Sequence, residues 1–140
     1  MTAQFFIDTN VLLYAGSGAP EDQRKKLIAR DVLAQPGIGF SVQVMLEFYD
    51  AAVRKERLEI THVEALAILE ALKPFPVLAM TRDLVLEAIK LKARYSISYW
   101  DAAIVIAAHH LGCTTLFSED LQHGQDFDGV KVVNPFVIES

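Results

Sequence analysis

The sequence has 140 residues, the usual size of one domain, and its 13 basic and 18 acidic residues give a net charge of −5. Hydrophobic residues make up 52% and charged residues 22% of the chain, which excludes intrinsic disorder, collagen-like repeats and low-complexity tails. The acidic balance, taken alone, argues against a nucleic-acid partner, because nucleic-acid-binding domains commonly carry a basic surface.

The longest purely apolar run, Ala102 to Ala108, is far shorter than the roughly 20 residues that a membrane span requires. The first residues lack the basic start and apolar stretch of a signal peptide, and the single Cys113 has no partner for an internal disulfide. We therefore expect one domain over residues 1–140, located in the cytoplasm, with no membrane contact.

In the first half of the chain, short apolar runs alternate with helix signals. Pro20 suits a first helical turn, and Ser41 can cap the helix that follows it. Thr61 and Glu64 have the spacing of a capping box, in which each side chain accepts a backbone N–H at the helix start. The predicted elements are a strand at 5–7, helices at 11–15 and 20–35, a strand at 38–40, and helices at 41–55 and 61–72.

The second half continues the alternation. Thr81 and Ser98 can each cap a helix, and Gly112 suits the end of the second of these helices. The predicted elements are an edge strand at 75–78, where proline is tolerated, a helix after Thr81, a helix at 98–111, and strands at 114–117 and 130–133. Such alternation favours parallel strand pairing with helices on both faces. The sequence therefore predicts an α/β fold, a three-layer α/β/α domain around a central, mostly parallel sheet of about four to five strands.

Carboxylates stand near several predicted strand ends, where open sheets of this kind bind ligands. Asp8 follows the first strand, Glu119 and Asp120 follow the fourth, Asp101 begins the preceding helix, and Glu47 lies about two turns inside the helix at 41–55. Ionised carboxylates that share a small site must either rise in pKa or bind a cation. Hard oxygen ligands without converging His or Cys select Mg²⁺ or Mn²⁺ over zinc.

Each of these acids also has a purely structural interpretation. Asp101 can be a helix-capping carboxylate, and Asp120 can be an ordinary turn residue. Glu47 lies in a largely apolar stretch of helix and Asp8 ends a buried strand, where an unpaired carboxylate is costly. For these two the sequence favours a role as ligand.

The acids lie within four longer blocks of sequence, FIDTNVLLYA (6–15), SVQV with EF (41–44 and 47–48), YWDAAI (99–104) and SEDLQHG (118–124). In this order the blocks resemble the four motif blocks of PIN-domain ribonucleases, and most of all those of the VapC toxins of bacterial toxin–antitoxin pairs. The resemblance covers essentially the whole chain, so it is more specific than any single acidic motif.

The resemblance implies that the catalytic acids are Asp8, Glu47, Asp101 and Asp120, supported by Ser118. Asp8, Asp101 and Asp120 would hold Mg²⁺, with Mn²⁺ as a substitute, and Glu47 would orient or deprotonate the attacking water. The implied activity is endonucleolytic hydrolysis of RNA to 5′-phosphate and 3′-hydroxyl ends. The implied partners are the RNA substrate, a cognate antitoxin and a second copy of the chain, with exposed apolar positions on the helices after Thr61 and Thr81 as candidates for the homodimer contact.

Several neighbouring residues keep two interpretations. Thr9 and Asn10 can support the acids through hydrogen bonds or cap the short helix. Whether Glu119 touches the metal stays open, because adjacent side chains after a strand point apart. His123, three residues beyond Asp120, can contact RNA or be a solvated loop residue.

The basic residues fall into three groups. Arg24, Lys25 and Lys26 begin a helix, against the preference of the helix dipole, and we therefore predict that they contact RNA phosphates. The groups at 54–57 and 90–94 end their helices, where cations are favoured, and are interpreted as solvated.

Other classes of acidic α/β domain fit the sequence less well. A haloacid-dehalogenase-like phosphatase needs an Asp where this chain has Asn10, and a receiver domain needs an acidic pair after its first strand. The remaining alternative is a catalytically silent module whose acidic groove holds a basic segment of another protein.

Setting four of the 18 acidic residues aside in one metal site leaves 14 acidic residues against 13 basic ones, so the net charge no longer argues against RNA.

Overall fold

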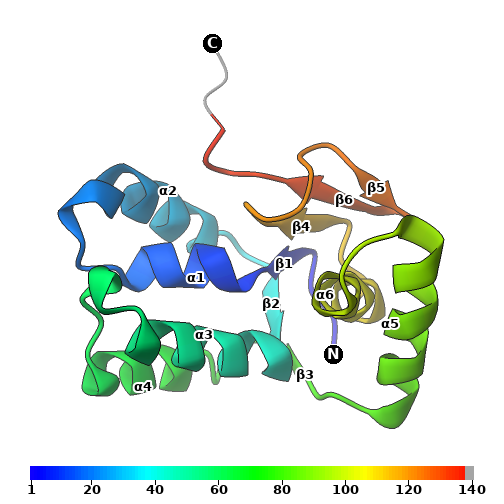
Figure 1. The fold of residues 1–140 in the computed structure, drawn as a ribbon, viewed down its shortest axis with the longest axis horizontal. Coiled ribbons are helices and arrows are strands. Elements are labelled where there is room, and N and C mark those ends of the chain that lie inside the picture. Colours follow the sequence, from blue (N-terminus) through cyan, green and yellow to red (C-terminus); the bar gives the residue numbers. More distant parts are fainter. Residues whose placement is uncertain (138–140) are drawn as a thin grey trace.

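The computed structural model describes residues 1–137, in which helices alternate with the strands of a six-stranded sheet (Figure 1). The strands are β1 (Phe5–Ile7), β2 (Ile38–Ser41), β3 (Val77–Leu78), β4 (Thr115–Phe117), β5 (Asp126–Phe127) and β6 (Val130–Val133). The helices are α1 (Thr9–Gly16), α2 (Gln23–Leu33), α3 (Val42–Arg54), α4 (His62–Glu70), α5 (Arg82–Tyr95) and α6 (Tyr99–His110), with short 3₁₀ helices η1 (Pro20–Asp22) and η2 (Glu56–Leu58).

The strand order is β3-β2-β1-β4-β6-β5, and every neighbouring pair except β5 and β6 runs parallel. From β1 the chain first builds outward through β2 and β3, and it then returns to the other side of β1 to form β4. The direction of building therefore reverses between β1 and β4. The carboxyl ends of these two strands form the kind of crevice in which open α/β sheets bind ligands.

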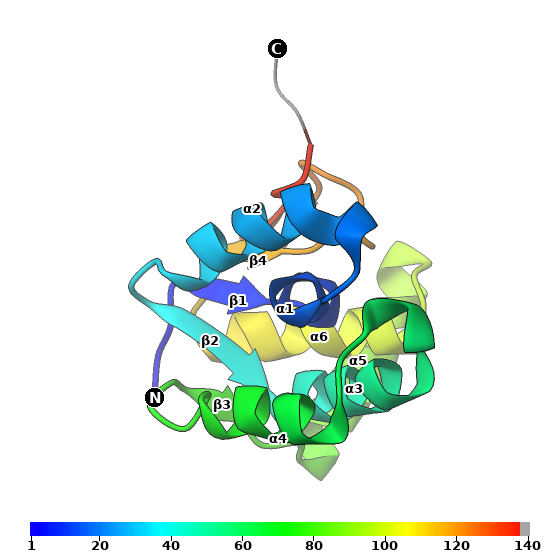
Figure 2. The ribbon, with the colours of Figure 1, turned by 90° about the vertical axis from the view of Figure 1, so that its left-hand side faces the viewer.

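The predicted three-layer α/β/α architecture is confirmed. Helices α1 to α4 lie on one side of the sheet and α5 and α6 on the other (Figure 1), and Figure 2 views the molecule from the side of α1 to α4. All five predicted strands are present. The sheet has six strands in place of the predicted four to five. The additional strand, β5, has only two residues, which is too short for a recognisable sequence pattern, and it pairs antiparallel with β6.

The predicted helix starts are largely correct because their capping side chains act as expected. Thr61 and Glu64 form both hydrogen bonds of the capping box at the start of α4. The first helix starts at Thr9, two residues earlier than predicted, because Asp8 caps it. The single helix predicted at 20–35 is instead a 3₁₀ turn, η1, followed by α2.

Close packing around β2 leaves no space for a side chain at Gly39. A Cβ atom there would lie 2.7 Å from Cβ of Ala3 and 3.1 Å from Cδ1 of Leu111, and Ala3 is held by its backbone N–H bond to the Leu111 carbonyl. We expect Gly39→Ala to lower the free energy of unfolding by about 1–3 kcal/mol, measured by urea denaturation.

Gly16→Ala is the matched control for this prediction. Its Cβ would lie 2.7 Å from the flexible end of the Ile68 side chain and 3.6 Å, an ordinary contact distance, from that of Ile60, and alanine is favoured over glycine by up to about 1 kcal/mol in a helix, which here ends at Gly16. The overlap should therefore cost less at Gly16 than at Gly39. A larger loss for Gly16→Ala than for Gly39→Ala would contradict the packing argument.

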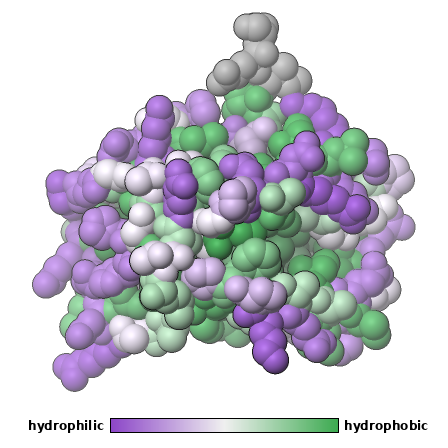
Figure 3. Space-filling model, turned by 180° about the vertical axis from the view of Figure 1, so that it is seen from behind, coloured by the Kyte–Doolittle hydropathy of each residue, from purple (hydrophilic) through white to green (hydrophobic). Residues whose placement is uncertain are grey.

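Some hydrophobic residues remain on the surface. Figure 3 shows a face on which they gather between hydrophilic residues. On the two helices expected to contribute to a dimer, Val63 and Leu66 of α4 and Leu86 and Ile89 of α5 are exposed. Within residues 1–137, none of the helices has both the length and the apolar character needed to cross a membrane.

Candidate active site

Asp8 lies at the reversal point of the sheet, between the end of β1 and the start of α1. It is only 4% exposed, and its Oδ1 accepts the backbone N–H of Thr9 at 2.7 Å. Its Oδ2 accepts the hydroxyl of Ser118, which follows β4, at 2.7 Å, and the amide of Asn10 at 3.4 Å. Asp8 is therefore held by both strands that border the crevice.

The pKa of Asp8 is raised to about 7, and the main cause is burial, which disfavours the charged carboxylate. The hydrogen bonds from Ser118 and Thr9 oppose the rise, whereas the negative charges of Asp120 and Glu47 add to it. Burial and neighbouring acids thus outweigh the hydrogen bonds. A cation bound beside this carboxylate would favour its ionised form.

Glu47 approaches Asp8 from α3. Its Oε2 accepts the Thr9 hydroxyl at 3.0 Å, and its Oε1 accepts the side-chain amide of Gln43 at 2.8 Å. The same Gln43 amide also donates to the backbone carbonyl of Trp100 at 3.1 Å, which ties α3 to the start of α6. No role was assigned to Gln43 from the sequence, although an amide in a largely apolar stretch of helix, one turn before a predicted catalytic acid, was a signal for one.

Asn10 joins the acids on the other side of the crevice. Its amide nitrogen lies 3.3 Å from Oδ2 of Asp120, and its carbonyl oxygen accepts the backbone N–H of Glu119 at 3.0 Å. The Ser118 hydroxyl accepts the backbone N–H of Asp120 at 3.1 Å. Thr9 and Asn10 therefore lie in the first turn of α1 and donate to acids, while the helix cap itself is Asp8.

Asp101 faces the same crevice from the first turn of α6. The helix cap uses the backbone N–H of Asp101, which donates to the Ser98 hydroxyl at 3.0 Å, so capping does not require its carboxylate. Burial raises the pKa of Asp101; the Ser98 hydroxyl opposes this rise, and the charge of Asp120 adds to it. Asp101 thus shares its electrostatic environment with Asp120, as Asp8 does.

The donor set suits a divalent cation. Within residues 1–137, no three Asp, Glu, His or Cys side chains are close enough together to form a complete metal site. The four acids nevertheless provide hard oxygen donors, and the raised pKa values of Asp8 and Asp101 show that protein groups do not fully compensate their charge. The assignment of Asp8, Asp101 and Asp120 as the ligands of such an ion stays a prediction.

Glu119 points away from this cluster. Its carboxylate accepts the Tyr14 hydroxyl at 2.8 Å and forms an ion pair with Lys25. The ammonium of Lys25 also lies 4.7 Å from the centre of the Tyr14 ring. The segment directly after β4 is thereby held against α1 and α2. The two adjacent acids in it, Glu119 and Asp120, therefore make different contacts.

The residues predicted to contact RNA have protein contacts of their own. Besides the ion pair of Lys25, the Arg24 guanidinium donates to the backbone carbonyl of Phe136 at 3.0 Å, and Lys26 is partly buried on the same helix. His123 accepts the backbone N–H of Asn134 at 3.0 Å. Their contact with RNA stays a prediction.

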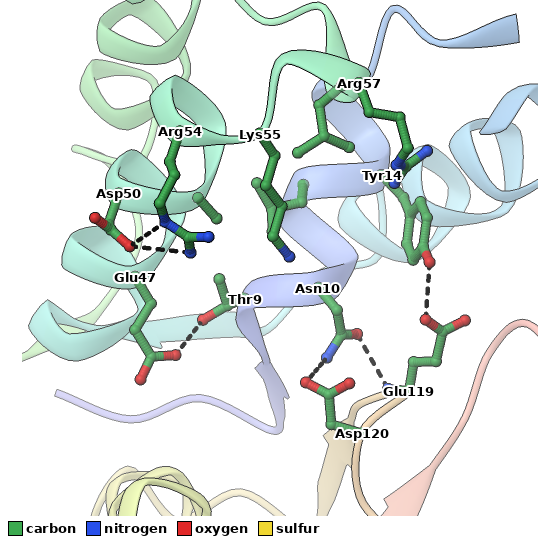
Figure 4. A pocket seen from close by; sticks show the side chains of 13 residues that line it. Thr9, Asn10, Tyr14, Glu47, Asp50, Arg54, Lys55, Arg57, Glu119 and Asp120 are labelled. Atoms are coloured by element: carbon green, nitrogen blue, oxygen red, sulfur yellow. Dashed lines mark hydrogen bonds and ion pairs between the residues drawn. The ribbon is translucent and has the colours of Figure 1, made fainter. Parts of the chain in front are cut away.

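A groove of about 350 Å³ runs from the acids along α3 (Figure 4). Glu47, Asp120 and Glu119 line one part of it, and the cations at the end of α3 and in η2 line another. Asp8 and Asp101 lie outside the lining. The lining residues are Thr9, Asn10, Leu13, Tyr14, Glu47, Asp50, Ala51, Arg54, Lys55, Arg57, Leu58, Glu119 and Asp120.

Comparisons with known proteins bear on the fold and the family of the chain. No match was found among curated proteins. Among solved structures, a toxin–antitoxin complex from Klebsiella pneumoniae contains a similar chain, with a TM-score of 0.69 and 20% identity, covering 96% of this chain and 100% of that one. VapC20 from Mycobacterium tuberculosis, described as a sarcin-ricin loop cleaving toxin, has a TM-score of 0.66 and 20% identity, covering 84% of this chain and 90% of that one. A chain of DNA-bound VapBC from Salmonella typhimurium has a TM-score of 0.62 and 19% identity, covering 94% of this chain and 97% of that one.

At these identities the solved structures show a common fold. The family model of the PIN domain is more direct evidence, because it matches residues 5–126 and so includes all four acids of the crevice. The resemblance inferred from the sequence is thereby confirmed at the level of the family, and the chain belongs to the PIN domain family.

Proposed function

We propose that the protein is a metal-dependent endoribonuclease and the toxin of a toxin–antitoxin pair. The observation that carries this proposal is the meeting of carboxylates from β1, α3, α6 and β4 at one edge of the sheet, with the pKa of Asp8 raised to about 7. Perturbed carboxylates in a crevice favour a chemical role over a purely structural one. VapC20, which has the same fold, is described as cleaving the sarcin-ricin loop, and this supports RNA as the substrate.

The proposed roles of the acids are those that the resemblance to PIN-domain ribonucleases implies. Asp8, Asp101 and Asp120 would hold Mg²⁺, or Mn²⁺ in its place, which when bound neutralises charge on the scissile phosphate and lowers the pKa of water. Glu47 orients the attacking water and accepts its proton. The water oxygen forms the new bond to phosphorus while the bond to the 3′ oxygen breaks and that oxygen takes a proton from solvent, leaving 5′-phosphate and 3′-hydroxyl ends.

Neutral side chains keep the acids in place during this reaction. The Ser118 and Thr9 hydroxyls each donate to an acid, and the Asn10 amide lies between Asp8 and Asp120. Hydroxyl and amide donors fix the direction of a carboxylate without adding a positive charge that would compete with a metal ion. Thr9, Asn10 and Ser118 are thus positioning residues.

The antitoxin and the dimer belong to the same proposal. Similar chains occur in toxin–antitoxin complexes, including one from Klebsiella pneumoniae, and this supports a protein antitoxin as inhibitor. The exposed apolar side chains of α4 and α5 support a second copy of the chain as partner. We expect the protein to act in the cytoplasm, where RNA substrates are present.

The proposal is tested by mapping new 5′-phosphate ends in total cellular RNA incubated with the purified protein. We expect cleavage with Mg²⁺, none with excess EDTA, and recovery when Mg²⁺ is restored. Asp101→Asn should reduce the rate at least about 100-fold, equivalent to about 2.7 kcal/mol of barrier. Glu70→Gln, an exposed acid near the end of α4, is the control and should leave the rate unchanged.

Full cleavage in EDTA would contradict the metal-dependent reaction. If no RNA is cut under any condition, the alternative of a silent acidic groove that binds a basic protein segment is favoured instead. A small reading frame for a DNA-binding protein directly upstream would support the toxin assignment.

A further inference from the structure

We propose that Lys55, flanked by Arg54 and Arg57, binds a backbone phosphate of the RNA strand at a subsite beside the catalytic acids. We call these three residues the cationic wall. The inference rests on the proposed function, because it assigns a binding contact to the substrate of that reaction. It concerns residues that the sequence alone marked as solvated ends of helices.

The cationic wall lines the same groove as two of the four catalytic acids, Glu47 and Asp120. Glu47 and Asp120 lie toward one end of its lining, and the three cations lie along α3 and η2 toward the other (Figure 4). The opposite charges are thus separated within one continuous groove. A metal ion at the acidic part and an available cation at the other part would present positive charge to a polyanion along its length.

Lys55 is the member of the wall whose charge is available. Arg54 is paired with Asp50 at 3.2 Å on the exposed surface of α3. Arg57 donates to Asp22 at 3.1 Å, and Asp22 is 5% exposed, so this pair is part of the structure of the chain. Over residues 1–137 the ion pairs include none with Lys55, and its side chain reaches into the groove between the two arginines (Figure 4).

The spacing along α3 suits a strand that continues past the cleaved bond. Glu47 and Lys55 are eight positions apart, and α3 ends at Arg54, so their backbones are separated by about 12 Å along the helix axis. Stacked nucleotides rise about 3.4 Å each, and this distance therefore corresponds to about three to four nucleotides. A strand whose scissile phosphate lies at the acids would bring another of its phosphates, about three to four nucleotides away, to Lys55.

Two of the three cations that the sequence predicts as RNA contacts are less available than Lys55, and the third, Lys26, is not among the residues that line the groove. Lys25 is engaged by Glu119 and Arg24 by the carbonyl of Phe136. Breaking those contacts to bind RNA would release the segment directly after β4 or the segment around Phe136. Binding through Lys55 breaks no ion pair within residues 1–137, which makes it the favoured electrostatic contact.

The test is a binding measurement with the full chain carrying Asp8→Asn, which prevents cleavage. The probe is a fluorescent, single-stranded RNA of mixed sequence and about a dozen nucleotides, titrated by anisotropy with Mg²⁺ at several NaCl concentrations. Adding Lys55→Met should weaken binding about 3–10-fold at low salt. It should also reduce the slope of log K against log salt by about 0.7, the value for one phosphate contact on a single strand.

Two further variants separate charge from other effects. Lys55→Arg keeps the positive charge and should retain most of the affinity. Lys92→Met removes an exposed lysine from α5, on the other side of the sheet, and should leave both affinity and slope unchanged. Arg57 is not replaced, because its loss would leave buried Asp22 unpaired and disturb the fold.

An unchanged affinity and slope for Lys55→Met would overturn the inference, and so would an equal loss for Lys92→Met. Failure of the subsite can be distinguished from failure of the proposed function. If the wild type cleaves RNA and Lys55→Met binds RNA normally, only the subsite is rejected. If the parent protein binds no RNA at any salt concentration, the subsite is rejected together with RNA as the substrate.

Discussion

Replacing Asp8 with asparagine is expected to abolish RNA cleavage and, in EDTA at pH 8, to make the protein more stable than the wild type. The loss of cleavage follows from the removal of a proposed metal ligand. The gain in stability follows from the burial of Asp8, whose charged form is disfavoured in the folded state. The variant would thus lose activity and gain stability, a combination that distinguishes a functional carboxylate from one that stabilises the fold.

The sign of the stability change depends on pH. The folded-state pKa of Asp8 is raised from 3.8 to about 7, so between these values the folded state binds more protons than the unfolded chain. The stability of the wild type therefore falls as the pH rises through this range and stays reduced above it. The asparagine variant avoids this loss, which amounts to at most about 4 kcal/mol at pH 8 and vanishes near pH 4.

The measured gain should be smaller than this limit. Oδ2 of Asp8 accepts both the Ser118 hydroxyl and the Asn10 amide, and an asparagine side chain has only one acceptor oxygen. Urea denaturation in EDTA at pH 5 and pH 8 tests the prediction, with Asp31→Asn, an exposed acid of α2, as the control. A variant that is less stable than the wild type at pH 8 would show that the hydrogen bonds outweigh burial.

Magnesium should reduce the stability difference between the wild type and Asp8→Asn. An ion that binds only the folded state adds about 2.7 kcal/mol when its concentration is 100 times its dissociation constant. We expect this gain for the wild type and for Asp31→Asn, and little of it for Asp8→Asn. Equal stabilisation of all three proteins by Mg²⁺ would place the ion elsewhere.

Replacing Glu47 with glutamine is expected to reduce the cleavage rate by about 10²–10⁴-fold, the range for loss of a general base. The fold should be unchanged, because a glutamine can exchange hydrogen bonds with both the Thr9 hydroxyl and the Gln43 amide that hold Glu47. The measurement is the single-turnover rate with Mg²⁺, together with the thermal unfolding temperature.

Asp50→Asn provides the matched control for this second prediction. Asp50 lies one turn further along α3 and lines the same groove, but its carboxylate is paired with Arg54. Its replacement should change the rate less than about threefold, since it changes only one exposed ion pair and the surface charge. Similar losses for Glu47→Gln and Asp50→Asn would indicate a general effect of groove charge in place of proton transfer.

Much of the fold could be predicted because its signals are local. The buried strand at residues 5–7 and the capping box of Thr61 and Glu64 each depend on residues close together in sequence, and both are present in the structure. The short strand β5 escaped prediction because its pairing with β6, and not its composition, makes it a strand. The start of α1 was misplaced because Asp8 was considered only as an acid and not also as a helix cap.

The sequence by itself determined the family and the α/β architecture and pointed to the four acids as candidates, because periodic hydrophobic runs and motif order are properties of the chain alone. The tertiary structure decided how side chains are shared among partners. It paired Glu119 with Lys25 and Tyr14, gave Gln43 a place between α3 and α6, and brought Lys55 into the groove of the acids. These contacts join residues far apart in sequence, so they follow from how strands and helices pack and not from the local pattern around any of them.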